Sequence, residues 1–455
     1  MLKKIIALLL ILIFGCSTSS YAFWFKKDKI QPIDLKEKYE YVNLGFFENF
    51  QDDNLVYYIE EAIKNNPSAR KASWQVEEYR QNIKYSFSNE LPKLSVGANY
   101  VGVHAPKFGN FDVSGNAFIL PFIASYEADF FLKNRDKTKS VKKSYEASKL
   151  QEKSIYIALA SDTATVYFNV LEYDKLICLQ EKILTLKEDE LKRNTNKYNQ
   201  GVINNQQYNV IKKEFETQKN NLVTLQKNRD ISLTQLALLC GKSPANIMDL
   251  KRSCFDNLEY HKSIPSEVSS DVIFSRPDIL AIERSLEKSK IDIRVARKEF
   301  LPRFNITGLW AFNTFARGTF FSWESSVAAI LAGATQDIFS GGRKIANLRI
   351  QKVKYEQLFE GYRQTSLNAV KEVNDSLCIT KLDTQIDNNT IKYLELEQKD
   401  YKDSLSKYSR GVISYVDLIN QYEKLLYIEQ NQSKTKAARL VNYLTLYKAL
   451  GGKNE

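Results

Sequence analysis

The sequence is poor in the residues that build catalytic and metal sites. Its 455 residues include two histidines, His104 and His261, far apart in the chain, and five cysteines with no C-x-x-C pair. A zinc centre or a His-based catalytic site therefore has almost no raw material. No residue set resembles a nucleophile with its base or a phosphate-binding glycine loop. We predict no enzymatic activity, no metal and no cofactor.

Long apolar segments are also missing. The mean hydropathy is −0.38, and beyond the first residues there is no apolar run of about 18 residues, which excludes a bundle of membrane helices. The chain is not disordered either, because it contains 25 Phe and 26 Tyr. The formal net charge is +11. This excess is moderate for so long a chain and does not indicate nucleic acid as a partner.

The first residues read as an export signal. Lys3 and Lys4 precede an apolar run from Ile5 to Gly15, which is too short to span a bilayer but typical of a secretory signal. Residues 1–15 are then removed before Cys16, which follows a lipobox-like Ile-Phe-Gly and becomes lipidated. The alternative is ordinary cleavage after Ala22, with small residues at the first and third positions of Ser-Tyr-Ala. We favour lipid attachment at Cys16.

The rest of the chain is an internal duplication. Asn66-Pro67 recurs as Arg276-Pro277, at an offset of 210 residues. The same offset relates Leu91-Pro92-Lys93 to Leu301-Pro302-Arg303, Lys197-Tyr198 to Lys407-Tyr408, Gly201-Val202-Ile203 to Gly411-Val412-Ile413, and Gly241 to Gly451. One segment slips to 208, where Asp129 matches Asp337. A unit of about 200 residues has therefore been repeated.

Each repeat is predicted to contain a long helical hairpin. Proline is missing from 122–243 and after Pro302, and glycine is nearly missing from 134–200 and 344–410. Without these breakers, helices of about 65 residues and on the order of 100 Å are allowed. Apolar residues at heptad spacing support them. A second helix of about 35 residues then runs back over 204–239 and 414–450 and ends at glycine C-caps.

Two β-hairpins precede the helical hairpins. Leu94, Val96, Ala98 and Tyr100 alternate with polar or small residues, which is the period of a strand. Similar alternation runs over 118–130 and 304–312, and a fourth strand is expected roughly over 323–338. These strands are long enough to cross a bilayer.

Four strands with an apolar face leave two unpaired edges, and lipid tolerates no unpaired backbone groups. Outer-membrane barrels need at least about eight strands, so one chain is too small and identical copies must join. The alternative is a soluble sheet packed against the helices. We favour the membrane sheet, because aromatic residues dominate one face and no spare amphipathic element is available to cover it.

The sequence resembles the TolC-like outer-membrane efflux proteins, in particular the lipoprotein branch that serves resistance-nodulation-division pumps. The resemblance covers about 50–452 and is carried by the doubled Asn-Pro and Arg-Pro-Asp, the doubled Leu-Pro, Asp-Ile-Phe-Ser-Gly-Gly-Arg, the Tyr-x-x-Gly-Val-Ile tips and the terminal Leu-Gly-Gly. It implies an α+β membrane protein in which a homotrimer pools its strands into a 12-stranded β-barrel, continued by a periplasmic α-helical barrel.

The expected organisation follows from the repeat and the resemblance together. An N-terminal segment over 16–54 precedes the first repeat at 55–260, with strands at about 94–131 and a helical hairpin at about 134–240. The second repeat spans 261–455, with strands at about 304–339 and a helical hairpin at about 343–450.

The resemblance also places functional residues. The turns between the helices would meet a periplasmic adaptor protein through Gly201, Val202, Ile203, Gly411, Val412 and Ile413. A periplasmic gate would use Tyr408 and Asp417, with Gln207 at the repeat-one equivalent of Asp417. Three Asp417 carboxylates around a narrow pore would repel one another and attract cations. The alternative for Asp417 is an ordinary solvated helix charge.

The implied function is a passive exit channel in the outer membrane of a Gram-negative cell, extending into the periplasm. An inner-membrane efflux transporter supplies the energy. The alternatives are the exit duct of a type I protein secretion system and a non-channel exported coiled-coil lipoprotein. Transported substrates are not encoded in recognisable motifs. A disulfide between Cys240 and Cys254 is conceivable in an oxidising compartment, but packing as small apolar side chains is favoured.

Overall fold

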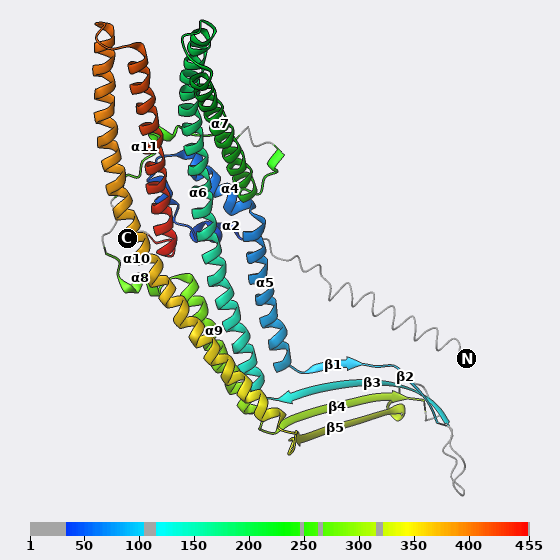
Figure 1. The fold of residues 1–455 in the computed structure, drawn as a ribbon. Coiled ribbons are helices and arrows are strands. Elements are labelled where there is room, and N and C mark those ends of the chain that lie inside the picture. Colours follow the sequence, from blue (N-terminus) through cyan, green and yellow to red (C-terminus); the bar gives the residue numbers. More distant parts are fainter. Residues whose placement is uncertain (1–32, 104–114, 246–249, 263–266, 315–321, 454–455) are drawn as a thin grey trace. The chain divides into compact units, whose positions relative to one another are not determined.

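The computed structural model describes residues 33–103, 115–245, 250–262, 267–314 and 322–453 (Figure 1). The chain divides into two units, Met1–Leu35 and Lys36–Glu455, and nearly all described residues belong to the second. Cys16, both predicted cleavage sites and His104 lie outside the described residues.

Two helical hairpins dominate the larger unit. Helix α6 (Lys133–Asn199) and helix α10 (Arg343–Ser409) each have 67 residues. Helix α7 (Asn205–Leu239) and helix α11 (Tyr415–Ala449) each have 35 residues and run back along them (Figure 1). All four pairs of helix ends differ by 210 residues, so the predicted duplication of a long helical hairpin is confirmed.

Shorter helices lead into each repeat. Repeat one has α4 (Asp53–Asn65) and α5 (Pro67–Phe87), and repeat two has α8 (Ser270–Phe274) and α9 (Pro277–Lys298). The remaining helical segments are α2 (Leu35–Glu40), α3 (Leu44–Glu48) and the 3₁₀ turns η1 (Ser88–Glu90), η3 (Phe255–Asn257) and η4 (Trp323–Ser325).

The residues before the repeated prolines tie the beginning of each repeat to its end. Asn66 caps α5 by accepting hydrogen bonds from the N–H groups of Ser68 and Ala69. Its amide also donates to the carbonyl of Leu239 at the end of α7, at 2.9 Å. In repeat two, Arg276 donates to the carbonyl of Ala449 at the end of α11, at 3.0 Å. Two different side chains therefore satisfy equivalent helix-end carbonyls.

The strands form one antiparallel sheet. Strand β3 (Gly115–Ala128) pairs with β4 (Arg303–Asn313), and β4 pairs with β5 (Ser326–Thr335). On its other side β3 pairs with β1 (Lys93–Val96) and β2 (Asn99–Val103). Among the described residues, β1 with β2 at one edge and β5 at the other each pair on one side only.

Strands β1 and β2 are one predicted strand with an interruption. The register is continuous, since Val96 pairs with Phe122 and Asn99 with Ile119. Between them, Gly97 donates its N–H to the carbonyl of Pro121 at 2.9 Å. Pro121 has no N–H to return the bond, so the ladder breaks there. The part of the chain that the structure describes therefore has four strand positions in five segments.

Two strands end earlier than expected. Strand β3 stops at Ala128 instead of near residue 131, because the carboxylate of Asp129 accepts hydrogen bonds from the backbone N–H groups of Lys133 and Arg135 and caps α6. Strand β5 covers 326–335 rather than 323–338, and Trp323–Ser325 forms a 3₁₀ turn. The connection from Asp337 to Arg343 is two residues longer than that from Asp129 to Lys133, which explains the slip from 210 to 208.

One face of the sheet is apolar and uncovered in the single chain. Phe122 pairs with Trp310, and Trp310 pairs with Ala328, which places all three on the same face. Tyr100 and Phe118 lie on that face with ring centroids 5.0 Å apart. The exposed fractions are 60% for Tyr100, 47% for Trp310 and 83% for Ile330. These are high values for large apolar side chains, so the face is built to contact something other than this chain.

The main core lies where α3 and α4 pack on α6 and α11. Phe47, Phe50 and Ile59 are fully buried there, against Phe168 and Tyr447. A smaller core in repeat two joins α8 and α9 to α10 and α11 through Val272, Ile279, Val373 and Leu446. The segment before the first repeat therefore fills a space that has no counterpart of the same size in repeat two.

Candidate functional site

The two turns between the paired helices have the same geometry. Gly201 has φ of +73° and Gly411 has φ of +74°, a left-handed conformation that side chains disfavour. The N–H of Val202 donates to the carbonyl of Lys197 at 2.8 Å, and that of Val412 to Lys407 at 2.9 Å. Both helices thus end in a glycine turn that satisfies their last carbonyls.

The predicted tip residues project from the turns with little covering them. The side chains of Val202 and Val412 are 66% and 68% exposed. A methyl group added at Gly201 or Gly411 would meet no atom of the chain within 4 Å. Each tip is therefore a small apolar knob with open space around it.

Asp417 and Gln207 are capping residues. The Asn204 side chain accepts from the N–H of Gln207, and the Gln207 side chain accepts from the N–H of Asn204. In repeat two, Asp417 accepts from both the N–H and the hydroxyl of Ser414, at 3.1 and 2.6 Å. Hydrogen bonds from the Ser414 side chain and backbone lower the pKa of Asp417. The sequence itself carries the signal for both caps, as the Asn/Ser-x-x-Gln/Asp pattern of a capping box.

The gate residues do not meet within one chain. Tyr408 lies against Tyr415 in its own hairpin, with ring centroids 5.8 Å apart. The Arg193 guanidinium lies over the ring of Tyr415, 4.3 Å from the ring centroid. Gln207 belongs to the other hairpin. The structure therefore gives Tyr408, Asp417 and Gln207 separate local partners.

A buried lysine joins the two hairpins further from the tips. Lys187 on α6 lies 2.8 Å from Glu214 on α7 and 2.8 Å from Glu423 on α11. Burial by itself lowers the pKa of Lys187, but its hydrogen bonds to Glu214 and Glu423 outweigh this effect and raise the pKa. The ammonium group therefore stays charged. Sequence inspection missed this site, because the three residues are far apart in the chain.

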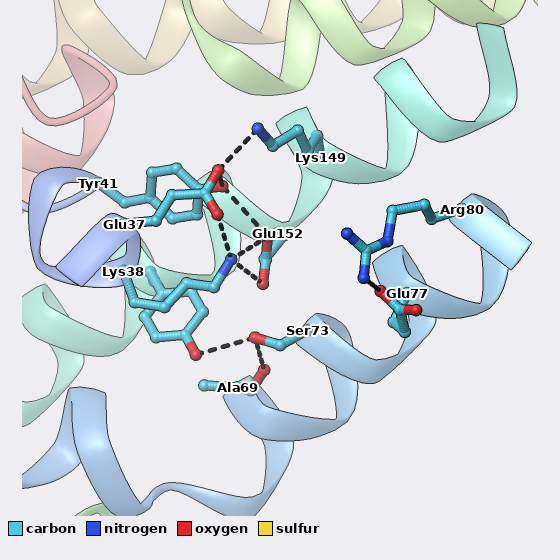
Figure 2. A network of polar contacts seen from close by, with 10 residues as sticks. Glu37, Lys38, Tyr41, Ala69, Ser73, Glu77, Arg80, Lys149 and Glu152 are labelled. Atoms are coloured by element: carbon cyan, nitrogen blue, oxygen red, sulfur yellow. Dashed lines mark hydrogen bonds and ion pairs between the residues drawn. The ribbon is translucent and has the colours of Figure 1, made fainter. Parts of the chain in front are cut away.

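A second buried ion pair fixes the N-terminal segment (Figure 2). The ammonium of Lys38 on α2 lies 2.8 Å from both carboxylate oxygens of Glu152 on α6, and the Glu152 side chain is fully buried. Tyr41 donates its hydroxyl to Glu37 and to Glu152, and Lys149 pairs with Glu37 at 2.7 Å. Burial and the Glu152 charge raise the pKa of Tyr41. Nothing periodic in the sequence signals this long-range cluster.

The described cysteines are all unpaired thiols. Cys178, Cys240, Cys254 and Cys378 are free, so Cys240 and Cys254 are not bridged in this structure. Cys240 is buried and contacts the carbonyl of Tyr58 at 3.6 Å, as the expected packing role requires. Cys254 is exposed, so the same expectation is wrong for Cys254. In the described part of the chain, no group of three or more His, Cys, Asp and Glu side chains could hold a metal ion.

Among the described helices, none has a stretch long and apolar enough to cross a membrane.

Comparison with known proteins gives the same repeat. The model of the outer membrane efflux protein family matches residues 58–242 and again 268–452. Both ends of the two matches differ by 210 residues, the offset found from the sequence.

The alignments with known relatives extend over nearly the whole length of both proteins. The chain is 26% identical over 431 residues to the cation efflux system protein CusC of Escherichia coli (strain K12), covering 90% of this chain and 89% of the relative. It is 25% identical over 435 residues to the probable outer membrane lipoprotein SilC of Salmonella typhimurium, covering 90% and 88%. The crystal structure of the CmeC outer membrane channel of Campylobacter jejuni superposes with a TM-score of 0.82 at 22% identity, covering 90% and 88%. With both repeats matched in the family model, the chain is a member of the outer membrane efflux protein family.

Proposed function

We propose that three copies of this outer-membrane exit channel close one 12-stranded barrel and one periplasmic helical tunnel. The observation that carries the proposal is the sheet, which has an exposed apolar face. Within the described residues, its edges at β1 with β2 and at β5 pair on one side only. In lipid, each unpaired backbone group costs several kcal/mol. Pairing β5 of one copy with β1 and β2 of the next removes this cost. The number of copies, three, comes from the resemblance to the outer-membrane efflux family.

Purified protein tests the assembly directly. We expect a trimer mass by light scattering in mild detergent, and stepwise ion conductance in planar bilayers. Brominated lipids should quench the fluorescence of Trp310, and Trp310→Phe should remove the quenched component. A monomer whose Trp310 is quenched by aqueous iodide instead would refute the barrel and favour the non-channel coiled-coil lipoprotein.

The helical tips are proposed to dock a periplasmic adaptor protein. The knobs are formed by Gly201, Val202, Ile203, Gly411, Val412 and Ile413. Val202 and Val412 expose their apolar side chains and Ile203 and Ile413 are half-buried beside them, which suits burial by a partner of complementary shape. A photoreactive amino acid at Val202 or Val412 should crosslink to the adaptor in cells. The same group at Lys219, exposed on α7 away from the turn, is the matched control. Equal crosslinking at Lys219 would reject tip docking.

Asp417, Tyr408 and Gln207 are proposed to form the periplasmic gate. The capping bond of Asp417 makes a simple alanine variant ambiguous, because it removes both the cap and the charge. Asp417→Asn retains an oxygen for the cap and loses the charge, whereas Ser414→Ala weakens the cap and keeps the charge. A charge gate predicts reduced cation preference of single channels in Asp417→Asn only. Unchanged selectivity in Asp417→Asn would leave Asp417 as a cap.

The partners follow from the family and from the relatives' names. An inner-membrane efflux transporter would supply the energy, and the names of the relatives include a cation efflux protein and a solvent efflux pump outer membrane protein. These names differ in cargo, which suits a duct whose specificity lies in the pump. Crosslinking at the tips, followed by identification of the captured adaptor, decides between an efflux pump and a type I secretion exporter.

Lipid attachment at Cys16 is proposed for the mature chain. Metabolic labelling with a palmitate analogue should mark the wild type and spare Cys16→Ala. A mature N-terminus at residue 23, determined by mass spectrometry, would support the alternative cleavage after Ala22 and reject the lipid.

A further inference from the structure

The helices form an open series within one chain. Helix α6 packs against α7 and α11, and α11 packs against α10, so α7 and α10 lie at the two ends of the series α7, α6, α11, α10 (Figure 1). The central contact joins the long helix of repeat one to the short helix of repeat two. If the series closes through another copy, the new contact joins the long helix α10 of repeat two to the short helix α7 of repeat one. The two contacts are then equivalent under the 210-residue repeat.

The central contact contains a three-residue ion cluster. Lys187 on α6 bridges Glu214 within its own hairpin and Glu423 on α11, both at 2.8 Å. The Lys187 side chain is only 8% exposed. Leu179 and Ile183 of α6 pack with Leu426 of α11 beside it.

Every charge in this cluster is inverted at the equivalent positions. Adding 210 to Lys187 gives Glu397, adding 210 to Glu214 gives Lys424, and subtracting 210 from Glu423 gives Lys213. The half of the inverted cluster that lies in one hairpin is formed, because Lys424 on α11 lies 2.9 Å from Glu397 on α10. The Glu397 side chain is 3% exposed. The third member, Lys213, is exposed on α7 at the far end of the series.

We propose that Lys213 of one copy pairs with Glu397 of the next copy, and that this inverted cluster forms the contact between α7 and α10 of neighbouring copies. The inference rests on the proposed trimer and names the residues that hold it together. The occupant of the α10 surface is a second copy of this chain, because Lys213 on its α7 is the third member of the inverted cluster at the equivalent height.

Apolar residues on the same two helices support this contact. Tyr393 and Leu396 of α10 are exposed, although their equivalents Ile183 and Leu186 are packed between α6 and α11. On α7, Ile231 is exposed, whereas its equivalent Val441 packs against the main core. Each edge therefore exposes apolar side chains whose equivalents in the other repeat are packed inside the chain.

The same relation holds for the shorter helices. Helix α6 contacts α9 through charged pairs such as Lys143 with Glu287, at 2.9 Å. The equivalent contact between copies would place α10 on α5. There Val353 replaces Lys143, and Trp74 replaces Arg284, which lies 3.7 Å from Glu146 of α6. Both Val353 and Trp74 are exposed in the single chain, and the equivalent of Glu287 is Glu77. An apolar contact at this height again suits a second copy.

Charge inversion also selects the order of repeats around the ring. A surface of repeat one placed against another repeat one would bring Lys187 to Lys213. Two repeat-two surfaces would bring Glu397 to Glu423. Like charges in a half-buried contact are repelled, so only alternation of repeat one and repeat two leaves every charge paired.

Photocrosslinking tests the contact. A benzoylphenylalanine placed at Lys213 of the full chain should crosslink to a peptide of α10 that contains Glu397, and only between copies. Lys219 is the control, because its equivalent Glu429 belongs neither to the ion cluster nor to the apolar cluster of Leu179, Ile183 and Leu426 in the central contact. A trimer whose residue 213 crosslinks elsewhere, or not at all, overturns this inference and leaves the channel standing. A protein that is not trimeric overturns both.

Charge reversal gives a second test. Lys213→Glu should shift the trimer-to-monomer equilibrium in detergent by about tenfold or more, and Lys219→Glu should not. Adding Glu397→Lys and Lys424→Glu to Lys213→Glu rebuilds the arrangement of the central cluster and should restore the trimer. Failure of the triple variant to restore what Lys213→Glu lost would refute the pairing.

Discussion

Replacing Gly241 by alanine should destabilise the chain far more than the same change at Gly201. Both glycines have positive φ, +66° at Gly241 and +73° at Gly201, so both substitutions cost roughly 1–2 kcal/mol in backbone strain. The surroundings differ. A methyl group at Gly241 would lie 2.5 Å from the carbonyl oxygen of Asn65, whereas one at Gly201 would meet nothing within 4 Å.

The neighbour at Gly241 is backbone, which cannot rotate away. Asn65 ends α4, and the next residue, Asn66, caps α5 and binds the carbonyl of Leu239. Moving this junction adds about 1–3 kcal/mol, the usual cost of overpacking. Gly241→Ala should therefore lose about 2–5 kcal/mol in total.

Denaturant unfolding followed by circular dichroism, at one detergent concentration, measures the difference. Gly201→Ala is the matched control for the φ penalty alone. If the two variants lose the same unfolding free energy, the crowding at Asn65 carries no energy and the reasoning is wrong.

Three further predictions concern buried groups. Lys38→Met should lower the unfolding free energy by about 3–5 kcal/mol, because Glu152 is left charged and buried. Combining Lys38→Met with Glu152→Leu should recover most of this loss in the same denaturant assay. A double variant that recovers none of it would contradict the role of the ion pair. Burial raises the pKa of Glu172 to about 7 despite the nearby charge of Lys434. The contribution of Glu172 to stability is therefore fully present at a pH below its pKa in the unfolded chain, and it is lost as the pH rises through 7. Glu172→Gln should therefore be more stable than wild type by about 2–4 kcal/mol at pH 8 and similar at pH 4, and equal curves at both pH values would refute the shift. Asn66→Ala should cost about 1–2 kcal/mol through the lost α5 cap, and an unchanged midpoint would exclude a capping role.

The long helices were predictable because their cause is local. Both breakers are missing over 134–200 and 344–410, and the glycines that end the hairpins stand beside them in the sequence. Strand ends were less accurate, because Asp129 was assigned to the strand although its carboxylate caps the helix after it. The break between β1 and β2 depends on Pro121, which lies opposite in the sheet and not in the interrupted strand.

Long-range electrostatic contacts were not predicted. Lys38 and Glu152 are joined only by the fold, and no spacing rule relates them. The inverted cluster is different, because the 210-residue offset already aligned Lys187 with Glu397. Comparing charges, and not only prolines and glycines, across the repeat would have shown it.

The main core extends beyond the part that the family model recognises. Phe46, Phe47 and Phe50 are nearly or fully buried, yet they precede residue 58, where the first match begins. Deleting one buried Phe side chain typically costs about 3–5 kcal/mol, and a typical domain has only about 5–15 kcal/mol in total. An expression clone trimmed to the recognised repeats would thus lose the buried phenylalanines that complete its main core. A clone that keeps this core must begin upstream of α2.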